Sequence, residues 1–71
     1  MEVSVVRDAV TRRPFQPFRF NLADGRAVPV PHSDFVWLEP RGRTCIVALG
    51  DGHLELIDVA LIQSITLQQA A

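Results

Sequence analysis

The sequence predicts a mainly β domain, in which one short N-terminal helix precedes a small five-stranded antiparallel open barrel. Three observations lead to this expectation. Apolar residues alternate with polar residues along several short segments, which is typical of half-buried strands. Asp-Gly pairs mark two tight turns, and the remaining connections are too short for the crossovers of a parallel sheet. The 71 residues suffice for one domain, residues 1–71.

The N-terminal segment has the apolar spacing of a helix. Val3, Val6 and Val10 recur at intervals of three and four residues, and Pro14 cannot continue a helix. We therefore expect a helix over about residues 3–12. A helix of about three turns buries little area by itself, so its valines should pack against the β segments that follow.

The β segments should extend over about residues 17–67, and the register of the first hairpin follows from its apolar pattern. A three-residue loop with a left-handed glycine places Phe20 opposite Val28 and Phe18 opposite Val30. A two-residue loop would divide the apolar side chains between the two faces of the sheet. We therefore expect the three-residue loop, which gathers the large apolar side chains on one face.

The longest apolar run, residues 44–49, should form the central strand, preceded by a short apolar strand at residues 35–38. A two-residue Asp-Gly loop after the central strand sets Leu49 opposite Leu54 and Val47 opposite Leu56. The polar residues His53 and Glu55 would then face outward.

The C-terminal segment allows two interpretations. Asp58 can cap a helix that continues through Gln69, or it can cap a single turn over residues 59–61 before a final strand over residues 63–67. We favour the strand, because its residues alternate and a barrel needs a closing member. Residues 68–71 should fray.

Composition restricts the classes of function. The formal net charge of −1 gives no general attraction to nucleic acids or to anionic membranes. No apolar stretch reaches the length of a membrane span, and no basic segment precedes a long apolar run. The single cysteine, Cys45, lies in an apolar run that suits a reducing compartment, so we expect a cytoplasmic protein.

We expect no catalytic site, no cofactor and no metal, and hence no enzyme. The only nitrogen and sulfur ligand types beyond Met1 are His32, Cys45 and His53, whose spacing matches no zinc pattern. The consecutive residues 32–34 are His, Ser and Asp, but three consecutive residues cannot converge as a hydrolase triad.

The run RPFQPFRF at residues 13–20, followed by LADGR at 22–26 and HSDFV at 32–36, resembles a group of short bacterial proteins of unknown function. The resemblance covers residues 13–38 well and residues 45–49 and 62–67 more loosely, and it implies no assigned activity. At the level of fold, a leading helix followed by five short strands resembles the Sm-like and SH3-like small barrels, and many Sm-like proteins form rings that bind RNA. The basic-glycine pair Arg41-Gly42 lies earlier in the chain than in their RNA-binding pattern.

The leading hypothesis is a non-enzymatic interaction module that associates with copies of itself, most simply as a two-fold dimer. The apolar fraction of 48% exceeds what so short a chain can easily enclose. Residues 28–30 and 64–67 should be sheet edges, and only the first carries prolines that discourage edge pairing. We therefore expect contact through the C-terminal strand, with Trp37, Ile65 and Leu67 nearby. The hypothesis also leaves open that the partner is a different protein.

The alternative hypothesis is an Sm-like protein that binds RNA or single-stranded DNA. Arginines beside exposed aromatic side chains suit stacked bases and their phosphates. The candidate contacts are Arg12 and Arg13 at the helix end and Arg41 and Arg43 at a turn, with Phe35 and Trp37 as the aromatic pair.

Overall fold

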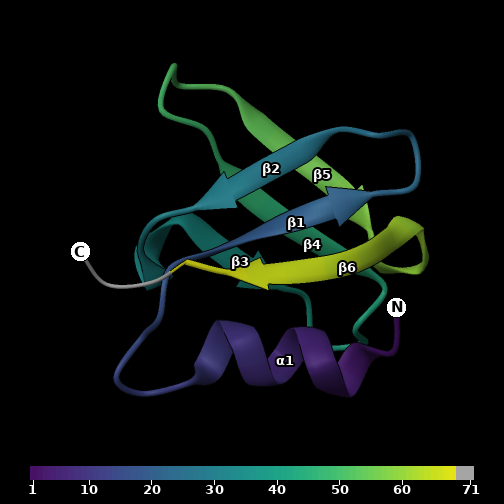
Figure 1. The fold of residues 1–71 in the computed structure, drawn as a ribbon, viewed down its shortest axis with the longest axis horizontal. Helices are drawn as coiled ribbons and strands as arrows, with labels where there is room; N and C mark the ends of the chain where they lie inside the picture. The colour runs from purple at the N-terminus through teal and green to yellow at the C-terminus, as the bar shows by residue number, and fades with distance from the viewer. Residues whose placement is uncertain (69–71) are drawn as a thin grey trace.

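The fold combines one helix with two three-stranded antiparallel sheets in the part of the chain that the structure describes, residues 1–68 (Figure 1). The structure is a computed structural model. The first sheet has the order β2-β1-β6 and the second the order β3-β4-β5. The elements are α1 (Val3–Thr11), β1 (Phe18–Leu22), β2 (Ala27–Val30), the 3-10 turn η1 (Ser33–Phe35), β3 (Val36–Leu38), β4 (Thr44–Ala48), β5 (Leu54–Asp58), the 3-10 turn η2 (Val59–Leu61) and β6 (Ile62–Leu67).

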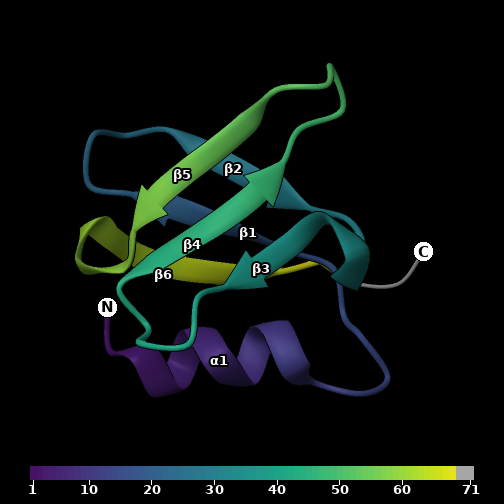
Figure 2. The same ribbon diagram turned by 180° about the vertical axis from the view of Figure 1, so that it is seen from behind.

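The predicted mainly β class with an N-terminal helix is confirmed, but the expected five-stranded open barrel is not, because six strands form two sheets. Two interruptions explain the difference. Pro31 has no N–H to donate to a ladder, and the turn η1 follows it, so β2 and β3 belong to different sheets. The turn η2 likewise separates β5 from β6. The sheets face each other with the core between them (Figures 1 and 2).

The helix α1 covers one side of the space between the sheets. It lies along β6 of the first sheet and β3 of the second (Figures 1 and 2). Val6 and Ala9 on its inner side are buried in the core. The helix ends at Thr11, one residue before the predicted end. Val6 is buried, and Val3 and Val10 are partly buried against the core, so the expected packing of the valines against the β segments is confirmed.

The first hairpin has the predicted register. Phe18 pairs with Val30 and Phe20 with Val28, and all four side chains are buried. Gly25 in the loop has a φ of 91°, a left-handed conformation that favours glycine. The apolar pattern was sufficient here because only one register places all the large side chains on one face.

The second hairpin differs from the prediction by one residue. Its loop contains three residues, 50–52, and the Leu49 N–H donates to the His53 carbonyl oxygen at 2.8 Å. Ala48, and not Leu49, therefore lies opposite Leu54. The predicted two-residue loop was wrong.

The far end of β5 explains this register. A two-residue loop would set Asp58 opposite Cys45, on the face that is buried, where an unpaired carboxylate is costly to desolvate. In the structure Ile57 lies opposite Cys45, and Asp58 faces outward. Its carboxylate accepts a hydrogen bond from the Ala60 N–H at 3.0 Å and caps η2. The capped turn before a final strand, favoured over the helix, is thus confirmed.

The final strand β6 pairs with β1, with Ile65 opposite Phe20 and Leu67 opposite Phe18. The strand therefore turns Ile65 and Leu67 toward the inner face of the first sheet. Beyond β6, the Gln68 N–H donates to the Pro17 carbonyl oxygen at 2.9 Å. The rest of the segment expected to fray, residues 69–71, lies outside the described residues.

Candidate interaction surface

The outer face of the first sheet, β2-β1-β6, is polar. Asn21 Nδ2 donates to Ser64 Oγ and to Thr66 Oγ1, both at 2.9 Å. Arg19 Nε donates to Asn21 Oδ1 at 3.3 Å. Such cross-strand hydrogen bonds suit the solvent-facing side of an antiparallel sheet, so this face requires no further cover.

The outer face of the second sheet, β3-β4-β5, is apolar. Trp37, Ile46 and Leu56 lie side by side in one row across the three strands, and Ala48 and Leu54 form the neighbouring row. Three of these side chains are largely exposed: Trp37 at 55%, Leu54 at 64% and Leu56 at 66%. We refer to these five residues as the apolar face.

A hollow of about 190 Å³ opens on the apolar face beside β3. It forms because Phe35 belongs to the turn η1 and not to the strand, so the row that contains Ala48 and Leu54 has no strand residue of β3. The hollow is lined by Asp34, Phe35, Val36, Trp37, Ile46, Ala48 and Leu54.

Trp37 was predicted from the sequence to lie at a contact surface, whereas Leu54 and Leu56 were expected on the buried side. The one-residue difference in the second hairpin moves both leucines to the outer face, because successive strand residues point to opposite sides. Glu55, which was expected to face outward, instead lies on the inner face, where it is half-buried opposite Val47. The outward position that Asp58 requires was the sequence feature that could have revealed this arrangement.

The two ends of the apolar face carry different charges. Asp34 lies in the turn η1, two residues before β3 begins, and Asp51 lies in the β4-β5 loop, so the antiparallel pairing places both at one end of the sheet. Arg41 and Arg43 lie in the β3-β4 loop, at the other end. Within residues 1–68, Asp34, Arg41 and Arg43 form no ion pair, whereas Asp51 Oδ2 lies 3.0 Å from Nδ1 of His53.

Two carboxylates at the arginine end are occupied within their own turns. Glu39 accepts hydrogen bonds from the backbone N–H groups of Arg43 at 2.7 Å and of Arg41 at 2.9 Å. These two bonds lower the pKa of Glu39. Asp58 caps η2 as described above. Among residues 1–68 neither carboxylate forms an ion pair with Arg41 or Arg43, so both guanidinium groups can meet an external carboxylate.

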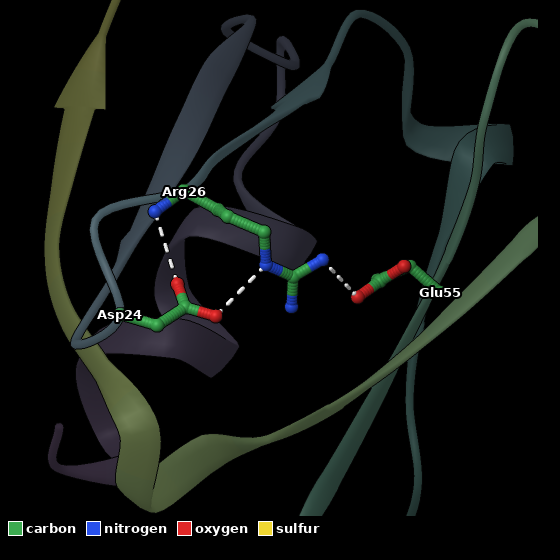
Figure 3. A network of polar contacts seen from close by, with 3 residues as sticks. All are labelled: Asp24, Arg26 and Glu55. Atoms are coloured by element: carbon green, nitrogen blue, oxygen red, sulfur yellow. Dashed lines mark hydrogen bonds and ion pairs between the residues drawn. The ribbon is translucent and has the colours of Figure 1, made fainter.

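An arginine links the two sheets on the side opposite α1 (Figure 3). Arg26 Nη1 lies 2.7 Å from Glu55 Oε1 on β5, and Arg26 Nε lies 2.9 Å from Asp24 Oδ2 in the first hairpin loop. The hydrogen bond to Glu55 raises the pKa of Arg26 most, and the hydrogen bond to Asp24 raises it further. Surface pairs of this kind contribute little stability, and here they connect the first hairpin loop with β5.

The other residues expected at an oligomer contact do not lie on the apolar face. Ile65 is half-buried against the core, and Leu67, 45% exposed, lines a hollow of about 160 Å³ between β6 and α1. β6 is an edge of its sheet, as predicted, and so is β2. The structure therefore does not bring Trp37 together with Ile65 and Leu67.

The four arginines proposed as nucleic-acid contacts form two separate groups. Arg12 and Arg13 follow the C-terminal end of α1, where Arg12 Nη2 lies 2.7 Å from Asp8 Oδ2. The loop of Arg41 and Arg43 packs at the other end of the helix, where Gly42 lies against Val3. A helix of nine residues is about 13 Å long, which keeps the two groups apart. Sequence reasoning missed Arg7, whose guanidinium reaches the Gly42 loop.

Cys45 is fully buried on the inner face of β4, and burial raises the pKa of its thiol from 9.0 to about 11. A thiol of this kind is protonated near neutral pH and shielded from reagents, so it is a poor nucleophile. Among the described residues, no group of three His, Cys, Asp or Glu side chains could hold a metal ion.

The buried thiol predicts a loss of stability in alkali. The unfolded chain loses the Cys45 proton near pH 9 while the folded chain keeps it until about pH 11, so stability falls as the pH rises between these values. The free energy of unfolding should decrease by about 1 kcal/mol between pH 8 and pH 10. Urea unfolding at several pH values measures this change.

The composition excludes the side chains that usually titrate in alkali beside cysteine, because all seven basic residues are arginines and the chain has no tyrosine. Few other groups therefore titrate in this pH range, and the terminal amino group is shared with the control variant Cys45→Ala. That variant should show a nearly flat profile. A parallel decline in both proteins would mean that another process destabilises the fold.

Comparison of the chain with protein-family models, with curated proteins and with solved structures finds no significant match. No helix within residues 1–68 is long and apolar enough to cross a membrane. Function is therefore inferred from the chain's own geometry.

Proposed function

We propose that this protein is a non-enzymatic interaction module, a small β domain that docks another protein surface on its apolar face. One observation carries the proposal: Trp37, Leu54 and Leu56 are more than half exposed on one sheet, while the outer face of the other sheet is polar and hydrogen-bonded. Contiguous exposed apolar side chains mark interaction sites, and tryptophan is prominent among the residues that anchor protein interfaces.

The energetic contribution of the apolar face is moderate. Full burial of a large apolar side chain contributes about 1.5–3 kcal/mol, so covering the exposed parts of these three contributes about 3–6 kcal/mol in total. Association costs at least about 4 kcal/mol in lost translational and rotational freedom. The apolar face can therefore supply the centre of an interface, but stable docking needs further contacts at its ends.

The arrangement of charges supports this function over nucleic-acid binding. The net charge is −1, and the candidate arginines lie in two groups at opposite ends of α1. Two finer assignments belong to the same proposal. The order of helix, hairpin and closing strand supports a small-barrel relationship of the Sm-like or SH3-like kind, and the buried free thiol of Cys45 supports a cytoplasmic location.

Photo-crosslinking in the native cell tests the proposal. A benzoylphenylalanine in place of Leu56 should form covalent adducts, because this position lies on the apolar face. The matched control is the same substitution at Ser64, an exposed position on the edge strand of the polar face. Adducts that form equally from both positions, or none from position 56, would reject the assigned surface.

A further inference from the structure

We propose that the surface which covers the apolar face is the same face of a second copy of this chain. In this two-fold dimer each strand of one copy runs opposite to the same strand of the other copy. The inference rests on the proposed function and names the partner for the same site. It departs from the contact expected through the C-terminal strand, because Ile65 and Leu67 point to the inner face of their sheet.

The charges at the two ends of the apolar face are complementary. Arg41 and Arg43 lie at one end, beside Glu39 and Asp58, whose carboxylates accept hydrogen bonds within their own turns, and Asp34 and Asp51 lie at the other end. When two identical sheets pack face to face with two-fold symmetry, the two-fold axis lies parallel to the planes of both sheets. An axis perpendicular to the strands brings Arg41 and Arg43 of each copy toward Asp34 and Asp51 of the other. Symmetry makes this contact twice.

The charges also disfavour the other simple arrangement. An axis parallel to the strands through the central strand β4 would exchange the places of β3 and β5, so the two arginine ends would lie together and Asp34 would lie toward Asp51 of the second copy. Like charges that face each other across an interface weaken association. The two-fold axis that crosses the strands is thus the one that the charged ends favour.

The apolar side chains fit the same arrangement. An axis between the two rows sets Ile46 of one copy over the small Ala48 of the other, and Leu56 over Leu54. The same operation carries Trp37 to the position beside β3 where the neighbouring row has no strand residue. That position is the hollow of about 190 Å³. The face therefore presents both a projecting indole and a recess for the indole of its partner.

The area of a three-stranded face is small for a dimer. Stable interfaces bury about 1,600 Å² in total, and weak ones less than about 1,200 Å². Five residues with charged ends belong to the smaller class, so we expect a dissociation constant in the micromolar range.

Trp37 is the single tryptophan of the chain, so intrinsic fluorescence reports directly on this face. As the concentration of the full chain rises from about 1 to 500 μM, the emission should shift to shorter wavelength and the mass from light scattering should double. The variant Leu56→Glu should remain monomeric, whereas Leu61→Glu, an exposed leucine outside the apolar face, should dimerise like the wild type.

Charge reversal tests the orientation. The double variant Arg41→Glu with Arg43→Glu, and the double variant Asp34→Arg with Asp51→Arg, should each dimerise at least about tenfold more weakly. An equimolar mixture of the two should regain association within about threefold of the wild type, because each basic end then meets an acidic end. Reversal of Arg13 and Arg19, which lie off the face, is the control. If circular dichroism shows that the first variant is unfolded, Arg41→Ser with Arg43→Ser replaces it. We expect this variant to weaken dimerisation less.

The outcomes separate this inference from the proposed function. A wild type that stays monomeric, while position 56 crosslinks to a different protein, overturns the dimer and leaves the interaction module intact. A dimer that charge reversal and mixing leave unchanged, or that Leu56→Glu does not weaken, overturns the arrangement described here. The absence of any adduct from position 56 rejects the proposed function itself.

Discussion

Replacing Phe20 with alanine should lower the free energy of unfolding by about 3–5 kcal/mol. The Phe20 side chain is fully buried and lies edge-on to Phe18, with ring centroids 5.0 Å apart and an interplanar angle of 75°. It also lies between Val28 of β2 and Ile65 of β6, so its loss opens a cavity at the centre of the first sheet. Urea unfolding followed by circular dichroism measures the change.

The matched control for Phe20 is its neighbour Arg19, whose side chain lies on the outer face of the same strand. Arg19→Ala should cost less than about 1 kcal/mol, because it removes only an exposed hydrogen bond. A domain of this size has a total stability of about 4–11 kcal/mol, so Phe20→Ala approaches complete unfolding. Equal losses from the two variants would contradict the inward and outward alternation of β1.

Replacing Gly42 with alanine should cost about 2–5 kcal/mol, for two reasons that add. Gly42 has a φ of 76°, a left-handed conformation that strains other residues by about 1–2 kcal/mol. A Cβ at this position would also collide with the Val3 side chain of α1, and overpacking of this kind costs about 1–3 kcal/mol. The thermal midpoint should fall accordingly.

Gly52 separates these two contributions. It has a φ of 90°, but a Cβ there would meet nothing within 4 Å, so Gly52→Ala carries the backbone strain alone. The difference between the two variants therefore measures the collision with α1. Adding Val3→Ala to Gly42→Ala should recover part of that difference. A Gly42→Ala variant no less stable than Gly52→Ala would show that the β3-β4 loop does not pack against the helix.

The two hairpins show how far sequence reasoning reaches in this protein. In the first, every large apolar side chain falls on alternate positions, so one register clearly buries more than the other. In the second, β4 is apolar on both faces and accepts either register equally well. The decision came from Asp58, six residues beyond the loop, whose carboxylate must remain outside and cap η2. Pairwise apolar matching did not include that requirement.

The same limitation determined how much of the candidate surface could be predicted. Trp37 was identified because an exposed aromatic residue is recognisable in a short apolar strand. Leu54 and Leu56 were not, because their exposure depends on the hairpin register. The grouping of Asp34 with Asp51 opposite Arg41 and Arg43 depends on strand order, which periodicity alone does not specify.

The alternation along β4 and β5 also has an evolutionary consequence. Cys45, Val47 and Ile57 lie in the core, while Ile46 and Leu56, one position away on the same strands, belong to the proposed docking surface. Because neighbouring positions then serve separate purposes, mutations on the outer face would alter partner recognition without disturbing the core beneath. On this proposal, a few outward substitutions suffice to change binding specificity while the scaffold stays constant.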